Sequence, residues 1–119
     1  MKYMLLIYGD GSAVSRQGAR DTPEARAAGA RWAEVTQRMD DAGVRVAGDA
    51  LQTPDSATTV RGEDAVVTDG PFAETKEVLL GYYLIDVPDL DEALSWARQL
   101  PNLPYGSVEV RPLMEVPVA

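Results

Sequence analysis

Val78-Leu79-Leu80-Gly81-Tyr82-Tyr83-Leu84-Ile85-Asp86 decides the fold, because this run is apolar at both its odd and its even positions. A β-strand with two apolar faces is covered on both sides of its sheet. The stretch 2–8, Lys-Tyr-Met-Leu-Leu-Ile-Tyr, has the same character. The two stretches therefore predict two strands that need a covering layer on either face.

Two helices are predicted between the strands. The first begins at Thr22-Pro23-Glu24, which supplies an N-cap residue, a proline at the first helical position and an acid in the first turn. It ends at Gly43, and the residues of its apolar stripe, all expected in the core, are Ala28, Trp32, Val35 and Met39. The second begins at Asp89-Leu90-Asp91-Glu92 and stops before Pro101; its stripe is Leu90, Ala93, Leu94 and Ala97.

Further strands are predicted at 44–51 and 107–114. Two short β-branched runs, 58–61 and 65–68, flank Gly62-Glu63-Asp64 and predict a hairpin with a three-residue loop. The resulting order, β-α-β, a hairpin, then β-α-β, predicts an α+β protein of the ferredoxin-like kind with an inserted hairpin. At 119 residues the chain is expected to form a single domain over 1–119.

Two helices cover only one face of such a sheet. Because the strands at 2–8 and 78–86 are apolar on both faces, we expect the helix-free face to pack against a second copy of the chain. The predicted assembly is a homodimer formed by contact between two sheets.

The composition excludes several classes of function. The chain has no cysteine and no histidine, which removes thiolate chemistry, disulfides and the commonest transition-metal ligands. No carboxylates occur at the spacing of a calcium or magnesium loop, so we expect no metal and no cofactor. The net charge of −8 argues against direct nucleic-acid binding. With no recognisable export signal and no apolar run of roughly 18–20 residues, we expect a cytoplasmic protein without a membrane span.

The segment 69–77, Asp-Gly-Pro-Phe-Ala-Glu-Thr-Lys-Glu, has two interpretations. In the structural one, Asp69-Gly70 is a turn, Phe72 anchors the loop in the core and the later charges form a solvated edge. In the functional one, Lys76 holds an anionic ligand and Asp69 or Glu74 acts as a base. A carboxylate acts as a base near neutral pH only if burial or another acid raises its pKa.

A second group of candidate site residues comes from the strands. Glu109 and Arg111 share one strand face, as an ion pair or dimer contact, or as a site in which Arg111 binds a carboxylate. Tyr83 or Tyr8 would then donate a hydrogen bond to that ligand. Asp49 follows a glycine near a strand end and either caps a turn or serves the site as a base.

The segment 69–77 resembles the signature of the YCII-related proteins, in particular of the subgroup named after its DGPF motif. The likeness extends to 2–9, 42–44, 48–51, 81–85 and 106–112. It implies a dimeric α/β barrel of ferredoxin-like subunits and an association with extracytoplasmic-function sigma factors. YCII-related proteins with known chemistry use a His–Asp pair, and one such relative eliminates chloride from a chlorinated muconate. This chain has no histidine with which to form that pair.

Three functions follow as hypotheses. The first is a regulatory or binding module that takes a small anionic or aromatic molecule and is linked to a sigma factor. The second is an enzyme of proton transfer or elimination on a small carboxylate, with Asp69, Glu74 or Asp49 as the base. The third is a dimer with a structural function and no ligand. The fold alone does not distinguish them, because one fold hosts many activities.

Overall fold

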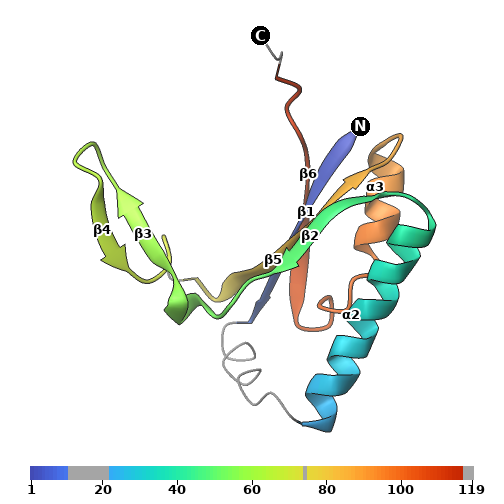
Figure 1. Ribbon diagram of the computed structural model, residues 1–119, viewed down its shortest axis with the longest axis horizontal. Helices are drawn as coiled ribbons and strands as arrows, with labels where there is room; N and C mark the ends of the chain where they lie inside the picture. Colours follow the sequence, from blue (N-terminus) through green and yellow to red (C-terminus); the bar gives the residue numbers. More distant parts are fainter. Residues whose placement is uncertain (11–21, 74, 117–119) are drawn as a thin grey trace.

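A four-stranded antiparallel sheet forms the centre of the described chain in the computed structural model (Figure 1). The structure describes residues 1–10, 22–73 and 75–116. The strands are β1 (Lys2–Asp10), β2 (Arg45–Ala50), β5 (Glu77–Asp86) and β6 (Gly106–Pro112). Their order is β2-β5-β1-β6, and each neighbouring pair is antiparallel. This order, with two helices in the described residues, is compatible with a ferredoxin-like fold.

Both described helices lie on the same side of this sheet (Figure 1). In α2 (Pro23–Asp41) the hydroxyl of Thr22 accepts a hydrogen bond from the Ala25 backbone N–H at 3.1 Å. In α3 (Leu90–Ala97) the Asp89 carboxylate accepts one from the Glu92 backbone N–H at 3.0 Å. The N-caps predicted from the sequence are therefore confirmed, because these side chains satisfy amides that have no partner within the helix.

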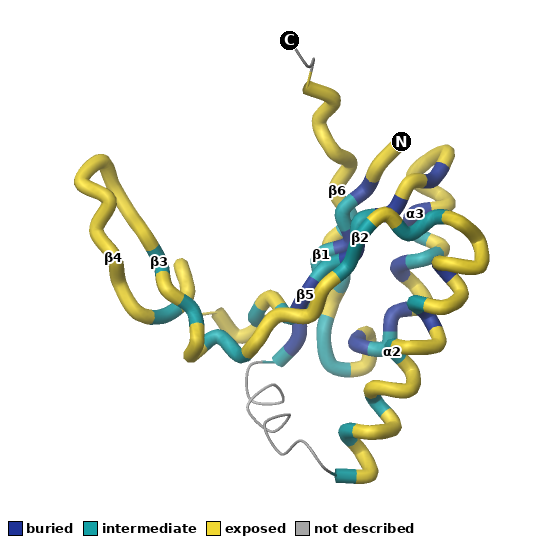
Figure 2. The backbone as a smooth tube through the Cα atoms, in the orientation of Figure 1, coloured by how far each residue is buried: buried dark blue, intermediate teal, exposed yellow. Residues whose placement is uncertain are grey.

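The core lies between the sheet and the two helices (Figure 2). It is built from alternate residues of the central strands, from the C-terminal half of α2 and from α3 with its flanking segments. Its buried apolar members are Tyr3, Leu5, Ile7, Val35, Met39, Tyr83, Ile85, Val87, Ala93, Ala97 and Leu100. The intervening residues of β1, Met4, Leu6 and Tyr8, are half-buried on the helix-free face.

The predicted apolar stripes of both helices are only partly buried. Val35 and Met39 of α2 are fully buried, whereas Ala28 and Trp32 are half-buried because the N-terminal half of the helix stands away from the sheet. In α3 the prediction for Leu90 is wrong. It is 49% exposed, because it is the first helical residue and lies beyond the edge of the core.

A β-bulge interrupts the alternation of β5. Ile7 pairs with Gly81 but Tyr8 pairs with Leu79, so Leu80 is the extra residue. An extra residue reverses the side-chain alternation beyond it. Strict alternation predicted Leu80 on the same face as Tyr82, which is the helix-free face. Because of the bulge, Leu80 packs instead against the core on the helix side.

The inserted hairpin forms an arm that projects from the body (Figure 1). It consists of β3 (Thr58–Arg61) and β4 (Val66–Asp69), a separate two-stranded sheet preceded by a short 3-10 helix, η1 (Pro54–Ser56). The turn runs one residue longer than predicted, since Ala65 has a φ of +53° and β4 begins at Val66. The Cα radius of gyration is 16.0 Å, against roughly 13.5 Å for a compact chain of this length.

The arm carries apolar side chains that nothing in the described chain covers. Val60, Val66 and Val67 are 62%, 59% and 64% exposed. The prediction that Phe72 anchors a loop in the core is wrong, because this ring is 77% exposed. It lies instead against Arg61, whose guanidinium carbon is 5.2 Å from the ring centroid. The residues after β4 follow the arm, which takes Phe72 out of reach of the core.

Candidate functional site

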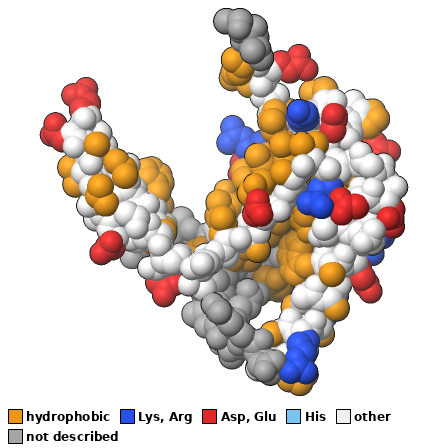
Figure 3. Space-filling model, viewed as in Figure 1, with side chains coloured by type: hydrophobic (Ala, Val, Ile, Leu, Met, Phe, Trp, Pro, Cys, Tyr) orange, Lys and Arg blue, Asp and Glu red, His pale blue; other side chains and the backbone are white. Residues whose placement is uncertain are grey.

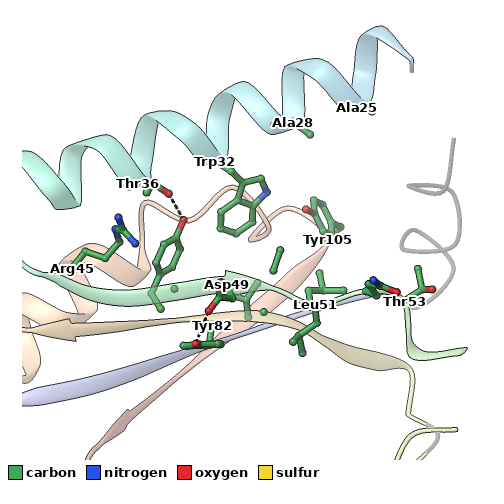
Figure 4. A pocket seen from close by; sticks show the side chains of 18 residues that line it. Ala25, Ala28, Trp32, Thr36, Arg45, Asp49, Leu51, Thr53, Tyr82 and Tyr105 are labelled. Carbon is green, nitrogen blue, oxygen red and sulfur yellow. Dashed lines mark hydrogen bonds between the residues drawn. The ribbon is translucent and has the colours of Figure 1, made fainter. Parts of the chain in front are cut away.

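A cleft of about 810 Å³ opens between α2 and the sheet. Its walls come from the N-terminal half of α2, from β2 and the three residues after it, and from β5 (Figure 4). The helix contributes small residues there, Ala25, Ala28 and Gly29. Apolar side chains line the hollow between α2 and the sheet (Figure 3). The stand-off of the helix is therefore what creates the space.

Aromatic rings form one wall of the cleft. Trp32 stacks on Tyr83 with ring centroids 6.3 Å apart and an interplanar angle of 29°. The hydroxyls of Tyr83 and Thr36 are 2.5 Å apart and share a hydrogen bond. Tyr105 also lines the cleft (Figure 4). Offset rings at this spacing attract one another, so the wall is a rigid stacking surface.

Two glycines bring the floor strands close together. A Cβ at position 48 would lie 2.6 Å from Cδ1 of Tyr83, so only glycine lets this ring lie across β2. A Cβ on Gly81 would lie 2.6 Å from the carbonyl oxygen of Asp49. Glycine in a strand interior often marks such a close approach. The position of the Tyr83 ring thus depends on Gly48.

Arg45 and Asp49 are the charged residues among the described lining of the cleft, and each has a partner. Arg45 donates from Nε and Nη2 to the two carboxylate oxygens of Asp40, at 2.7 and 3.0 Å. These hydrogen bonds lower the pKa of Asp40 and raise the pKa of Arg45. Asp49 accepts a hydrogen bond of 2.8 Å from the Tyr82 hydroxyl, which raises the pKa of Tyr82.

The carboxylate of Asp49 points away from the cleft. Figure 4 shows its hydrogen bond running to Tyr82, whose side chain lies on the other side of the sheet. The polar atoms left to face the cleft are largely uncharged, from Thr36, Tyr83, Gln52 and Thr53. In the described ranges no group of three or more His, Cys, Asp or Glu side chains is placed to hold a metal.

Two of the residues predicted for the site, Tyr83 and Asp49, line this cleft. Two others lie together elsewhere: the Tyr8 hydroxyl donates to Oε1 of Glu109 at 3.5 Å, in a shallow groove at the end of β1 and β6. Arg111 pairs with Met4 on the helix-free face. Arg111 and Tyr83 therefore lie on opposite faces of the sheet and do not share a ligand within one chain.

The segment 69–77 does not join the cleft. Asp69 is exposed at the end of β4, and Lys76 is exposed just before β5. Neither lines the cleft, and Glu74 lies outside the described residues. At the end of the segment, Ser107 donates from Oγ to the Glu77 carboxylate at 2.6 Å, which attaches it to β6.

Sequence reasoning missed Trp32, Thr36, Arg45 and Tyr105 as cleft residues. Trp32 was predicted in the core, and one part of its ring does pack there, but the rest lines the cleft. The stripe of α2 contained a usable signal, because its first half offers only small side chains to the sheet. No pattern marks Tyr105, which is brought in by the turn before β6.

Comparison with known proteins places the chain in a family. The YCII-related domain matches residues 1–117. The chain belongs to the YCII-related family. Among its relatives is the uncharacterised protein R00369 of Rhizobium meliloti (strain 1021), which is 42% identical over 117 residues, 95% of this chain and 92% of that protein. The YCII-related domain here includes both the cleft and the arm.

The described helices of this YCII-related protein do not meet the requirements of a membrane span. Neither α2 nor α3 combines the length and the apolar character that crossing a bilayer requires. α3 has only eight residues, and α2 carries exposed charges at Arg31, Glu34 and Arg38.

Proposed function

We propose that the protein is a binding module for a small molecule and that the ligand occupies the cleft between α2 and the sheet. The observation that carries the proposal is an apolar cavity of about 810 Å³ with a wall made of Trp32 and Tyr83. Ligand sites in proteins typically measure about 300–1,000 Å³ and combine apolar walls with a few polar groups. The Thr36–Tyr83 hydroxyl pair supplies such polar groups.

A thermal-shift screen of metabolites against the full chain tests this proposal. We expect at least one compound to raise the melting temperature, and Ala28→Leu to abolish the shift by filling the cleft. Ala30→Leu is the matched control, because Ala30 is exposed on the same helix and does not line the cleft. The proposal fails if no compound shifts wild type, or if both variants respond as wild type does.

We further propose that the module is a homodimer formed through the helix-free face. The support is apolar surface in two places on one chain: Leu6 and Leu84 are half-buried on that face, and Val67 is exposed on the arm. Figure 3 shows apolar side chains on the arm and on the side of the body facing it. An isolated two-stranded hairpin is marginally stable in water, so the arm gains most from a partner. A twofold dimer buries both surfaces at once.

Light scattering coupled to size-exclusion chromatography tests the dimer. Wild type should elute with twice the mass of the chain, while Leu6→Arg and Val67→Lys should shift it toward the monomer. Leu90→Lys is the control, since Leu90 is 49% exposed on α3, away from both surfaces. A monomeric wild type at micromolar concentration contradicts the homodimer.

The resemblance of the segment 69–77 to the DGPF signature supports assignment to a subgroup within the family. We propose membership of the DGPF subgroup, with the dimeric α/β barrel that it implies, and a cytoplasmic module linked to an extracytoplasmic-function sigma factor. Affinity capture with the tagged full chain, in extracts that contain the sigma factor, tests the link. The link is rejected if the tagged chain recovers no more sigma factor than an untagged control does.

A second candidate function is favoured by one observation, the place of Asp49 at the edge of the cleft. In this hypothesis Asp49 is the base of an elimination or proton transfer on the bound ligand. A general base must come within about 3 Å of the proton it removes, so Asp49 would have to turn from Tyr82 toward the cleft. Asp49→Asn should then abolish turnover of an identified ligand and preserve its binding. Unchanged turnover in Asp49→Asn eliminates this candidate.

A further inference from the structure

We infer that the ligand of the cleft is a flat, uncharged aromatic molecule with a neutral polar substituent. The inference rests on the proposed function and adds the chemical class of the ligand. It follows from three properties of the described lining: its charges, its shape and its hydroxyl groups.

The charges argue against an anionic ligand. Arg45 is the cation among the described lining residues, and its Nε and Nη2 both donate to Asp40. A ligand carboxylate would have to displace Asp40 from that edge of the guanidinium. The net charge of −8 would also repel it. A cation fares no better, because the Asp49 carboxylate accepts a hydrogen bond from Tyr82 and points away from the cleft. Burying an unpaired charge is costly, and neither sign of charge finds an unpaired partner among the described lining residues, so an ion gains little that offsets its lost hydration.

The shape favours a planar ring system. The stacked pair of Trp32 and Tyr83 forms a wall, while Ala28 and Gly29 on α2 leave space above the floor. A Cβ built on Gly29 meets nothing within 4 Å, so this part of the cleft is open. Leu80, brought to this face by the β-bulge, adds an apolar floor. A flat aromatic molecule fits between such surfaces and stacks on the indole.

The hydroxyl groups account for a neutral polar substituent. Thr36 and Tyr83 share a hydrogen bond of 2.5 Å in which either oxygen is the donor. Two hydroxyls bring two protons, and their mutual bond uses one. The other proton remains available to donate to a ligand oxygen, and the hydroxyl oxygens still have lone pairs to accept. A phenol or an aryl ketone matches this pair without bringing a charge.

Three probes with one ring skeleton test the inference: naphthol, naphthoate and naphthylmethylammonium. Isothermal titration calorimetry at pH 7 with the full chain gives the dissociation constant of each. We expect naphthol to bind roughly tenfold or more tightly than either ion, the factor that corresponds to one lost charge-compensating interaction. Tighter binding of naphthoate or of the ammonium probe overturns the neutral class and leaves the proposed function standing.

Asp40→Asn provides the decisive variant, because it releases the guanidinium of Arg45 without altering the walls. Naphthoate should then bind roughly tenfold more tightly than it binds wild type, while naphthol is unchanged. Asp41→Asn is the control: it removes the same charge from the neighbouring residue, which accepts a hydrogen bond from Gln37 and not from Arg45. Equal gains for naphthoate in the two variants overturn the argument from Arg45. Failure of all three probes on wild type overturns the aromatic class, whereas the compound screen alone decides the proposed function.

Discussion

The hydroxyl oxygens of Thr36 and Tyr83 lie 2.5 Å apart and join α2 to the central strand β5. Thr36 is one helical turn after Trp32, and Tyr83 is the ring on which Trp32 stacks. One hydrogen bond and one ring contact therefore fix the distance between helix and sheet at the cleft wall. A substitution at Thr36 or Tyr83 should therefore change both the stability of the fold and the width of the cleft.

Tyr83→Phe should destabilise the fold by about 1 kcal/mol, since it removes a hydrogen bond and keeps the ring. Thr36→Val should cost a similar amount, and the double variant should cost little more than either single one. Urea unfolding followed by circular dichroism measures the three free energies as a double-mutant cycle. Costs that simply add would mean that the two hydroxyls do not interact in solution.

Asn102 is a second strongly constrained position. Its side chain is fully buried, and Nδ2 donates to the carbonyl oxygens of Tyr8 and Ser107 at 2.8 and 2.9 Å. Its buried Oδ1 makes no hydrogen bond to any described residue, so the amide stabilises the fold through Nδ2. It attaches the turn that carries Tyr105 to β1 and β6.

Asn102→Ala should lower the free energy of unfolding by about 2–4 kcal/mol, because it removes both hydrogen bonds of the buried amide and opens a cavity. Gln99→Ala, at an exposed amide three residues earlier, should cost less than about 1 kcal/mol. Urea midpoints compare the two variants. Equal midpoints would show that the buried amide contributes no more than a surface one.

The elements of the fold were largely predictable because their signals are local. Thr22 and Asp89 are N-caps that specify where a helix begins within a few residues of sequence, and both helices begin directly after them. The two apolar faces of β1 and β5 identified the strands of the sheet. Antiparallel pairing and the position of the helices follow once these elements are known.

The position of the arm and most of the cleft could not be predicted, because they depend on how the elements are oriented relative to one another. A helical stripe identifies the face of α2 that meets the sheet, but it does not give the angle that leaves Trp32 half-buried. The bulge at Leu80 reverses the side-chain alternation beyond it, and the adjoining Gly81 does not locate the extra residue, because a strand glycine also marks a close approach between backbones. Phe72 looked like a core anchor by residue type, yet the arm takes it away from the body.

The ion pair of Asp40 and Arg45 predicts a pH dependence of stability. Arg45 lowers the pKa of Asp40 in the folded chain. A carboxyl with a lowered pKa stabilises the folded state above its unfolded pKa, about 3.9 for Asp, and this contribution is lost as the pH falls through the folded value. The Asp40→Asn variant should therefore have a lower melting temperature than wild type at neutral pH. The two melting temperatures should converge as the pH falls through the pKa of Asp40 in the folded chain.

The size of this difference should be small and sensitive to salt, because the two side chains remain 30% and 40% exposed to solvent. Differential scanning calorimetry over a pH series, at low and high sodium chloride, gives the comparison. Asp41→Asn serves as the charge-matched control and should not reproduce the convergence. A gap between Asp40→Asn and wild type that persists in acid would mean that a neutral contact, and not the ion pair, carries the effect.

The same substitution at two glycines should have opposite effects. A Cβ on Gly106 would lie 2.0 Å from the carbonyl oxygen of Tyr8 and 2.8 Å from Cα of Gly9, both backbone atoms. Gly106→Ala should therefore separate β1 from β6 and destabilise the fold by about 1–3 kcal/mol or more. Gly29 lies inside α2 with nothing within 4 Å of its would-be Cβ, so Gly29→Ala should stabilise the fold by about 0.5–1 kcal/mol. We expect a urea midpoint below that of wild type for Gly106→Ala and above it for Gly29→Ala. A midpoint of Gly106→Ala above that of wild type would contradict the close approach of β1 and β6.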